Sequence, residues 1–198
     1  MQSLWGMGMT TARMTRREAA AGLSGLVVAS AGAAQAQPAS HRHATLSSAQ
    51  KEQQAFSFLD LKMFVEVDSD DTKGEMAVVR VFVPPGAGPA PHVHSREDEF
   101  FTVVRGRYRF RHGDEEMDGA AGSAVFMPRG IPHVFRNLSD QPGEHVLTPV
   151  PGGLEKLFRE VSAAQIQMPR DKAQYDALCA KYGLRNLPPD SLPLSKDG

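Results

Sequence analysis

Residues 91–106 read PHVHSREDEFFTVVRG, and this segment carries the strongest signal for both fold and chemistry. Its two histidines stand two residues apart, three acidic residues follow closely, and an apolar run then ends at a glycine. Because side chains two residues apart on a β-strand point to the same face, His92 and His94 project together. The segment therefore predicts a pair of imidazoles on one face of a strand, with a carboxylate close by.

Which acidic residue can join the two histidines depends on the strand face that its side chain occupies. Glu99 lies five residues after His94, and this odd step would place it on the opposite face of one continuous strand. We therefore expect the chain to turn between them, and the polar residues 95–98 suit a tight turn. In that arrangement Glu99 opens the next strand and faces the histidines, whereas Glu97 and Asp98 face solvent. A different turn would make Glu97 the partner, and the spacing alone leaves that alternative open.

A third histidine stands downstream in the segment GSAVFMPRGIPHVFRN, residues 122–137. The prolines and glycines of this segment predict a turn, and His133 follows at the start of a strand. Three imidazoles and one carboxylate form a mixed nitrogen and oxygen donor set, which suits first-row divalent metals that keep open coordination positions. Asn137 is interpreted as a turn-stabilising side chain and not as a ligand.

Around these segments the chain alternates short apolar runs with glycine- and proline-rich turns. Candidate strands cover residues 61–67, 75–83, 99–105 and 107–116, and further runs follow up to residue 150. Short strands with turns about every 8–12 residues are typical of an all-β sandwich or barrel. Gly106 separates two of the runs, which indicates a hairpin between them. We expect one β-barrel domain over residues 55–150.

Beyond this domain the hydrophobic period changes from that of a strand to that of a helix. In the segment GGLEKLFREV, residues 152–161, apolar residues follow the i, i+3, i+4, i+7 spacing of an amphipathic helix. A second helical pattern covers residues 169–183, ends at Gly183 and includes Cys179, which we interpret as a buried core residue. Residues 151–198 are therefore expected to hold C-terminal helices and an extended, proline-rich tail.

The N-terminus has the pattern of an export signal. Arg16 and Arg17 precede a mildly apolar run, and a small-x-small cleavage pattern ends at Ala36. The arginine pair resembles a twin-arginine signal, with a general secretory signal as the alternative. We predict that residues 1–36 are cleaved, that residues 37–54 form a flexible tether, and that the mature protein is periplasmic or secreted.

The composition argues against several classes of function. The formal net charge is -1 and the isoelectric point is about 6.7, so the chain has no basic footprint for nucleic acid. No apolar run of the sequence reaches the roughly 20 residues that a membrane-spanning helix needs. The single cysteine forbids an intrachain disulfide. We therefore expect no nucleic-acid partner and no membrane span.

The two histidine-containing segments resemble the two sequence motifs of the cupin superfamily. The matching residues are Gly86, His92, His94, Glu99 and Gly106 in the first motif, and Gly122, Pro128, Gly130, His133 and Asn137 in the second. Fifteen residues separate the motifs. The resemblance covers residues 56–150 closely, and it implies an all-β, cupin-type jelly-roll β-barrel with one or two C-terminal helices.

The same resemblance implies a ligand set for a divalent transition metal, which would be Fe, Mn, Ni, Cu or Zn. The implied metal ligands are His92, His94, Glu99 and His133. Apolar side chains on the inner wall suit a planar or aromatic substrate, and the candidates are Phe101, Val103, Phe135 and Met127.

The first motif and the segment PGGLEKLFREV together resemble single-domain, quercetin-dioxygenase-like cupins. That resemblance implies a small dioxygenase for a flavonol-like or other enol or aromatic substrate, with Glu99 as both metal ligand and catalytic base. The alternatives are a metal-dependent isomerase or decarboxylase acting on a small sugar or keto acid, and a binding protein without turnover. Cupins commonly pair through outer strands, so we expect a homodimer.

Overall fold

The computed structural model describes residues 54–195 of the chain. The predicted export signal, residues 1–36, lies outside the described residues, as does all but the last residue of the predicted tether, residues 37–54. Both therefore stay predictions.

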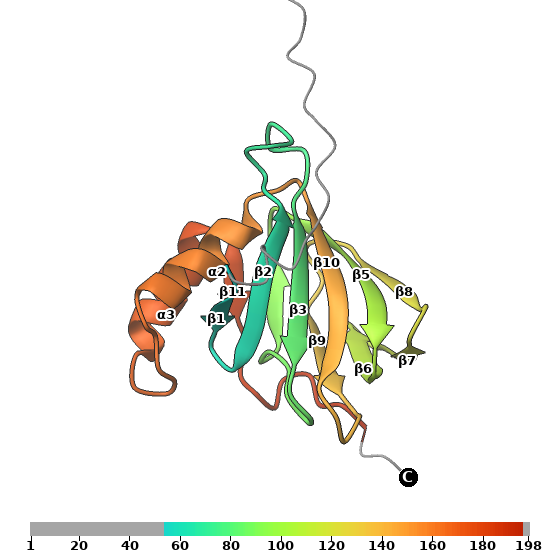
Figure 1. The fold of residues 1–198 in the computed structure, drawn as a ribbon. Coiled ribbons are helices and arrows are strands. Elements are labelled where there is room, and N and C mark those ends of the chain that lie inside the picture. The colour runs from blue at the N-terminus through green and yellow to red at the C-terminus, as the bar shows by residue number, and fades with distance from the viewer. Residues whose placement is uncertain (1–53, 196–198) are drawn as a thin grey trace, which may run out of the picture. The chain divides into compact units, whose positions relative to one another are not determined.

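Six of the described strands form one antiparallel sheet (Figure 1). In the order in which they are hydrogen-bonded, these are β1 (Phe56–Phe58), β2 (Leu61–Val67), β3 (Val78–Val83), β10 (Gly143–Val150), β5 (Asp98–Arg105) and β8 (Ala124–Met127). β1 is an edge strand of this sheet, which is the place where the expected homodimer would pair; the dimer itself stays a prediction.

The second sheet contains the other five strands of the described region. Their order is β11 (Leu184–Asn186), β4 (His92–His94), β9 (His133–Asn137), β6 (Arg107–His112) and β7 (Glu115–Ala120). The two sheets enclose one hydrophobic core, to which alternate residues of each strand contribute. On β3, for example, Val79, Val81 and Val83 are buried while the residues between them are partly exposed. The predicted all-β jelly roll is confirmed.

The predicted hairpin at Gly106 is wrong. β5 lies in the first sheet and β6 in the second, so the chain crosses between sheets at this glycine and the two strands do not pair. Gly106 has φ +96°, a conformation that L side chains rarely adopt, and the chain uses it to turn this corner. The hairpin of this region is instead β6–β7, in which His112 pairs with Glu115.

The two predicted C-terminal helices are confirmed as α2 (Leu154–Ala163) and α3 (Lys172–Lys181). Figure 1 shows both helices on the side of the molecule where β1 and β11 lie. The apolar face of α2 packs on β1, where the rings of Phe158 and Phe58 are 4.7 Å apart. Cys179 is buried in α3, as expected. No helix in residues 54–195 is long and apolar enough to cross a membrane.

The tail after α3 contains a strand that the sequence pattern did not predict. Gly183, with φ +82°, ends the helical segment, and β11 then pairs antiparallel with β4. The following residues run along the second sheet, where Arg111 donates to the Pro193 carbonyl and Arg109 donates to the Ser195 carbonyl. The tail therefore adds an edge strand beside the histidines of β4, in addition to its extended part.

Candidate metal centre

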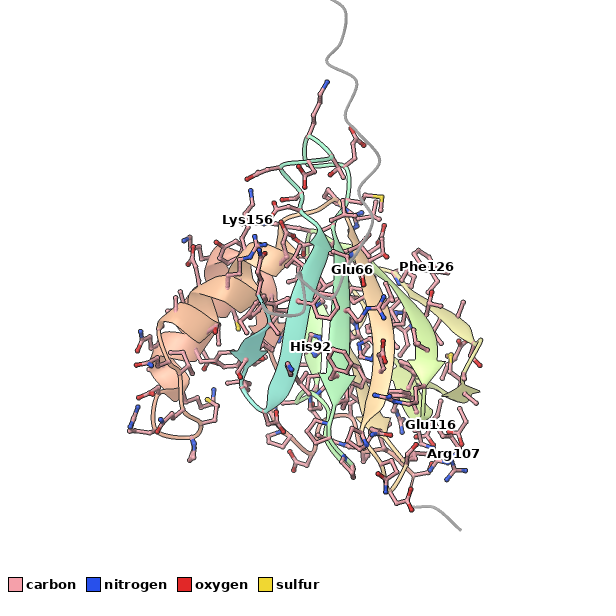
Figure 2. All side chains as sticks on the ribbon, in the orientation of Figure 1. Glu66, His92, Arg107, Glu116, Phe126 and Lys156 are labelled. Atoms are coloured by element: carbon pink, nitrogen blue, oxygen red, sulfur yellow. The ribbon has the colours of Figure 1, made fainter. Side chains whose placement is uncertain are left out.

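β4 carries the first two predicted ligands, and both histidines point into the interior. His92 and His94 are buried, and the intervening Val93 is partly exposed, as the strand alternation predicts. The register of the second sheet pairs His92 with His133 of β9, and their ring centroids lie 4.4 Å apart. Figure 2 shows His92 near the middle of the sheets, whereas Arg107 and Lys156 lie at the periphery.

Glu99 reaches the same place from β5 of the opposite sheet. Its Oε2 atom is 2.9 Å from His133 Nε2 and 3.6 Å from His94 Nε2. The ligand atoms of the four predicted residues all lie within 4.8 Å of one another, and all four residues are buried. The structure therefore brings together the three histidines and the glutamate that the motifs indicated, in a cluster that could hold a metal ion.

The unpaired atoms of this cluster support a bound cation. His94 Nε2, Glu99 Oε2 and His133 Nε2 are buried and make no well-formed hydrogen bond within residues 54–195. A buried polar atom without a partner costs about 1–3 kcal/mol, so three that converge on one point call for an explanation. Three imidazole nitrogens and one carboxylate oxygen are a donor set for first-row divalent metals, and such an ion would satisfy all of these atoms.

Backbone carbonyls orient two of the three imidazoles. His92 Nδ1 is 2.9 Å from the Ala90 carbonyl oxygen, and His133 Nδ1 is 3.2 Å from the Ile131 carbonyl oxygen. When Nδ1 carries the proton and donates it to these oxygens, Nε2 keeps its lone pair directed into the cluster. The local chain path thus sets the tautomer that metal binding requires.

Glu97 does not face solvent as predicted, whereas Asp98 lies on the outward face of β5 as expected. β5 already begins at Asp98, so the turn is shorter than expected and Glu97 folds inward, with only 4% of its surface exposed. Its Oε2 atom lies 3.4 Å from His94 Nδ1. Asp98 is half-buried and accepts a hydrogen bond from Arg129 at 2.7 Å. Glu99 is therefore the acid within the cluster, and Glu97 contacts the outer nitrogen of one of its histidines.

Burial and the neighbouring charged groups determine the protonation states of the residues in the cluster. Burial alone would raise the pKa of Glu99, but the neighbouring His94, His133 and His92 lower it to about 2. Burial lowers the pKa of His92 well below its usual value. Burial also opposes the charged form of His94, although Glu99 and Glu97 raise the pKa of this ring overall. Glu99 is thus ionised at neutral pH, and it offers an anionic oxygen to the cluster.

An interior cavity of about 40 Å³ adjoins the cluster. Its wall is mainly apolar and includes Phe101 and Phe135, as expected, together with Leu154 and Phe158 of α2. Val103 and Met127, also expected there, are buried in the core and do not belong to this lining. Such a volume holds roughly three water molecules at ~10–15 Å³ each. It is far smaller than the ~300–1,000 Å³ of pockets for drug-sized ligands.

His145 of β10 lines the same cavity, and the sequence reasoning missed it. Only 1% of its surface is exposed, and its ring packs against the rings of Phe101, Tyr108 and Phe135 at centroid distances of 5.4, 5.4 and 5.0 Å. Burial lowers the pKa of His145 to about 3, partly opposed by Glu99, so the imidazole is neutral. The alternation of this strand puts His145 on one face with the apolar Leu147, but the sequence left the facing of the strand undecided.

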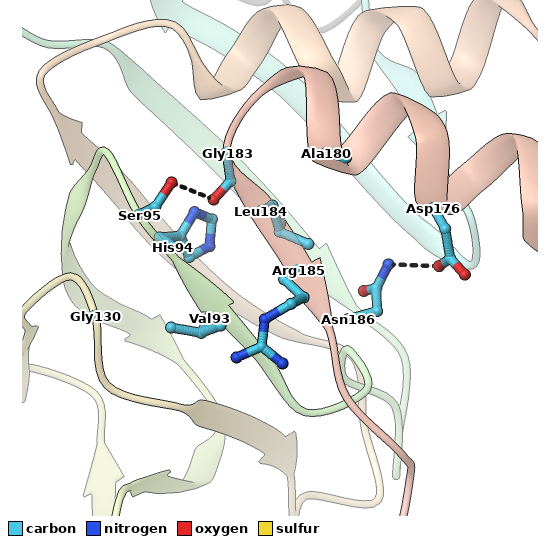
Figure 3. Close-up of a pocket in the computed structure, with 10 residues that line it drawn as sticks. All are labelled: Val93, His94, Ser95, Gly130, Asp176, Ala180, Gly183, Leu184, Arg185 and Asn186. Carbon is cyan, nitrogen blue, oxygen red and sulfur yellow. Dashed lines mark hydrogen bonds between the residues drawn. The ribbon is translucent and has the colours of Figure 1, made fainter.

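A larger cavity, of about 580 Å³, lies on the outer side of β4, between β11 and α3 (Figure 3). Its polar groups largely pair with one another: Asn186 donates to Asp176 at 3.1 Å, and Ser95 donates to the Gly183 carbonyl at 2.8 Å. The orphaned atoms of the histidine cluster point instead into the interior. We therefore place the candidate site inside the barrel and not in this groove.

Comparison with known proteins links part of this domain to one protein family. Residues 79–148 match the family model described as the cupin domain, and this segment contains all four residues of the cluster. No curated protein sequence matches the chain. The family match and the two-sheet fold support membership of the cupin superfamily.

Solved structures with a similar fold include three from bacteria. KdgF from Halomonas sp. has 20% identity and a TM-score of 0.44, over 48% of this chain and 84% of that one. A predicted oxalate decarboxylase from Thermotoga maritima has 18% identity and a TM-score of 0.46, over 49% and 90%. A sugar phosphate isomerase of the cupin superfamily from Silicibacter pomeroyi has 23% identity and a TM-score of 0.40, over 46% and 59%.

Proposed function

We propose that this chain is a metal-dependent cupin enzyme, and specifically a dioxygenase that acts on a small enol substrate. The observation that carries the proposal is the convergence of three buried imidazoles and one ionised carboxylate at the wall of an interior cavity. A divalent ion in this site would carry a net charge near +1 with Glu99, and it would stabilise negative charge on a substrate oxygen.

The side chains of the cavity have separate tasks in this proposal. His92, His94 and His133 supply neutral nitrogen ligands, and Glu99 supplies the single anionic one. The rings of Phe101 and Phe135 exclude bulk water from the space beside the cluster. A dry surround strengthens the electrostatic attraction between the site and an enolate oxygen.

The cavity volume favours a substrate with few non-hydrogen atoms. A three-ring flavonol is much larger than about 40 Å³, so the structure gives no support to the flavonol-like substrate that the sequence resemblance implied. A small enol or keto acid is closer in size. We therefore narrow the proposed substrate class to small molecules that present an enol or enolate oxygen.

The second candidate is a metal-dependent decarboxylase or isomerase for a small keto acid or sugar. The observation that favours it is His145, because such an enzyme needs a further polar group beside the ligands and this residue lines the cavity. The two candidates differ in what they consume: the dioxygenase takes up oxygen, whereas the decarboxylase releases carbon dioxide without it.

The test begins with the metal content of the purified full chain. Wild type is expected to contain about one divalent metal per chain, and His92→Ala and His94→Ala only a small fraction of that amount. His112→Gln is the control for the loss of a neighbouring histidine: His112 of β6 pairs with His133, and their ring centroids lie 6.2 Å apart, but it is not one of the four residues of the cluster. Stoichiometric metal in both alanine variants would rule out the site.

Turnover is then measured with a panel of small enols and keto acids. Oxygen uptake that depends on the metal supports the dioxygenase. Release of carbon dioxide under anaerobic conditions supports the decarboxylase instead. A metal-loaded protein that changes none of these compounds, while still binding them, would leave the binding protein without turnover as the better description.

A further inference from the structure

His145 is a buried polar group whose chemistry the metal cluster does not use. Its Nδ1 atom is buried and has no hydrogen-bond partner within the described part of the chain. The ring is not one of the four residues whose ligand atoms converge, yet it lines the cavity that adjoins them. An imidazole with a buried, unpaired Nδ1 therefore belongs to the wall of the space in which a ligand of the cluster would sit.

Packing alone does not account for this residue. A leucine would fill a similar volume among the same aromatic rings without an unpaired nitrogen, and leaving a buried donor or acceptor unpaired destabilises the fold. The three surrounding rings hold the imidazole at one place, and no hydrogen bond to Nδ1 from residues 54–195 fixes which nitrogen carries the proton. Buried polar groups without a partner in the protein are often those that a ligand satisfies.

We infer that His145 is a substrate-binding residue, whose Nδ1–H donates a hydrogen bond to an oxygen of a small oxyanion bound at the cluster. The ligand class is a compact carboxylate or enolate, with one oxygen at the four-residue cluster and a second oxygen directed to the β10 side of the cavity. This inference rests on the proposed function, because it needs a metal at the cluster. The hydrogen bond from His145 orients the substrate and disfavours purely apolar molecules of the same size.

The cavity and the charge of the ring agree with this ligand class. Burial keeps the imidazole neutral, so it offers one N–H without adding a second positive charge beside the metal. A volume of about 40 Å³ admits a ligand of a few non-hydrogen atoms, and formate is the smallest carboxylate that has both oxygens. Formate is therefore the probe.

The experiment measures formate binding to the full chain loaded with Co²⁺, followed by the visible absorption of the metal. His145→Leu removes the hydrogen bond at nearly constant volume, and His145→Gln keeps an N–H donor. Tyr108→Phe is the matched control, because it removes the other buried polar group of this region, a hydroxyl that lies against Gly143. We expect equal Co²⁺ content in all four proteins.

The expected pattern is specific to a ligand-binding role. Formate affinity falls about tenfold or more in His145→Leu, stays within about threefold of wild type in His145→Gln, and is unchanged in Tyr108→Phe. In the metal-free protein, the melting temperature of His145→Leu rises by about 2–4 °C, because the unpaired nitrogen is gone. Weaker binding together with a more stable fold would support the inference.

Four results would overturn it. Formate could bind equally well to His145→Leu and wild type, or the metal-free His145→Leu protein could melt at a lower temperature, which would make the ring a packing residue. Wild type could also bind Co²⁺ but not formate; the proposed function would then still stand on its oxygen-uptake test. A wild type that binds no Co²⁺ would remove the proposed function together with this inference.

Discussion

At the scale of single residues, two carboxylates contact opposite nitrogens of one imidazole. Glu99 lies 3.6 Å from His94 Nε2, on the cluster side, and Glu97 lies 3.4 Å from His94 Nδ1, on the outer side. In the other two histidines of the cluster, the Nδ1 atom contacts a backbone carbonyl oxygen and not a carboxylate. His94 is therefore the histidine of the cluster whose orientation depends on a side chain, and a carboxylate there would also increase its basicity toward a metal.

Glu97→Gln is expected to weaken metal binding about 10–100-fold while the site still forms, because the amide orients His94 less firmly and carries no charge. A competition titration against a chelator measures the affinity. Asp98→Asn is the control, since Asp98 pairs with Arg129 on the other face of the strand and should not alter the affinity. An unchanged affinity in Glu97→Gln would mean that the carboxylate has no part in holding His94.

At the scale of elements, the corner at Gly106 decides how the two sheets are connected. The chain leaves β5 there and enters β6 in the other sheet, at a backbone conformation of φ +96°. A Cβ atom at this position would lie 3.1 Å from Gly143 Cα and 3.2 Å from Ser139 Oγ. The dihedral angle and the close approach of the neighbouring chain thus both favour glycine.

Gly106→Ala is expected to lower the free energy of unfolding by about 1–3 kcal/mol through backbone strain, and by a further amount through crowding. Gly122→Ala separates the two effects. Gly122 has a similar φ of +90°, but a Cβ there would meet no atom within 4 Å. Urea denaturation should show the larger loss for Gly106→Ala. Equal losses in both variants would show that crowding at the corner contributes nothing.

Helix α2 and strand β1 form part of the cavity wall and so affect access to the site. α2 contributes Leu154 and Phe158 to the cavity wall, and β1 contributes Phe58, which packs on Phe158. The C-terminal helix and the first strand thus complete an interior that the two motifs alone would leave open. This arrangement explains why the segment after the barrel bears on the size of the substrate.

At the scale of the whole molecule, buried neutral histidines make stability depend on pH. The pKa of His145 is about 3 in the folded state because of burial, whereas an exposed histidine in the unfolded chain has a pKa of about 6.5. Below about pH 6.5 the unfolded chain therefore binds a proton that the folded protein does not. Stability is then lost progressively as pH falls from about 6.5 toward 3.

The metal-free wild type is expected to lose about 1.4 kcal/mol per pH unit from His145 over the lower part of that range. His92 acts in the same direction, and His94, whose pKa is raised, acts against it. The comparison with His145→Leu isolates the contribution of one ring: urea midpoints at pH 7, 6 and 5 should fall less steeply in the variant. Parallel pH profiles would show that His145 is not buried neutral in the folded protein.

The sequence by itself determined the features that depend on local spacing. The His-x-His step placed two imidazoles on one face of β4, parity put Glu99 with the buried Phe101, and the two motifs predicted the jelly roll. The 3.6-residue period predicted both C-terminal helices. The strand faces and the helices follow from the geometry of a single element, which is set by neighbouring residues, whereas the jelly roll was implied by the resemblance of the two motifs to a known family.

Only the tertiary structure decided which segments meet. It placed β5 and β6 in different sheets, paired β11 with β4, and turned Glu97 inward to His94. It also put His145 beside the cluster, from a strand whose facing the sequence left undecided. Strand alternation specifies two faces but neither the partner strand nor which face becomes the interior. Those choices depend on contacts between distant parts of the chain, and such contacts exist only once the barrel has closed.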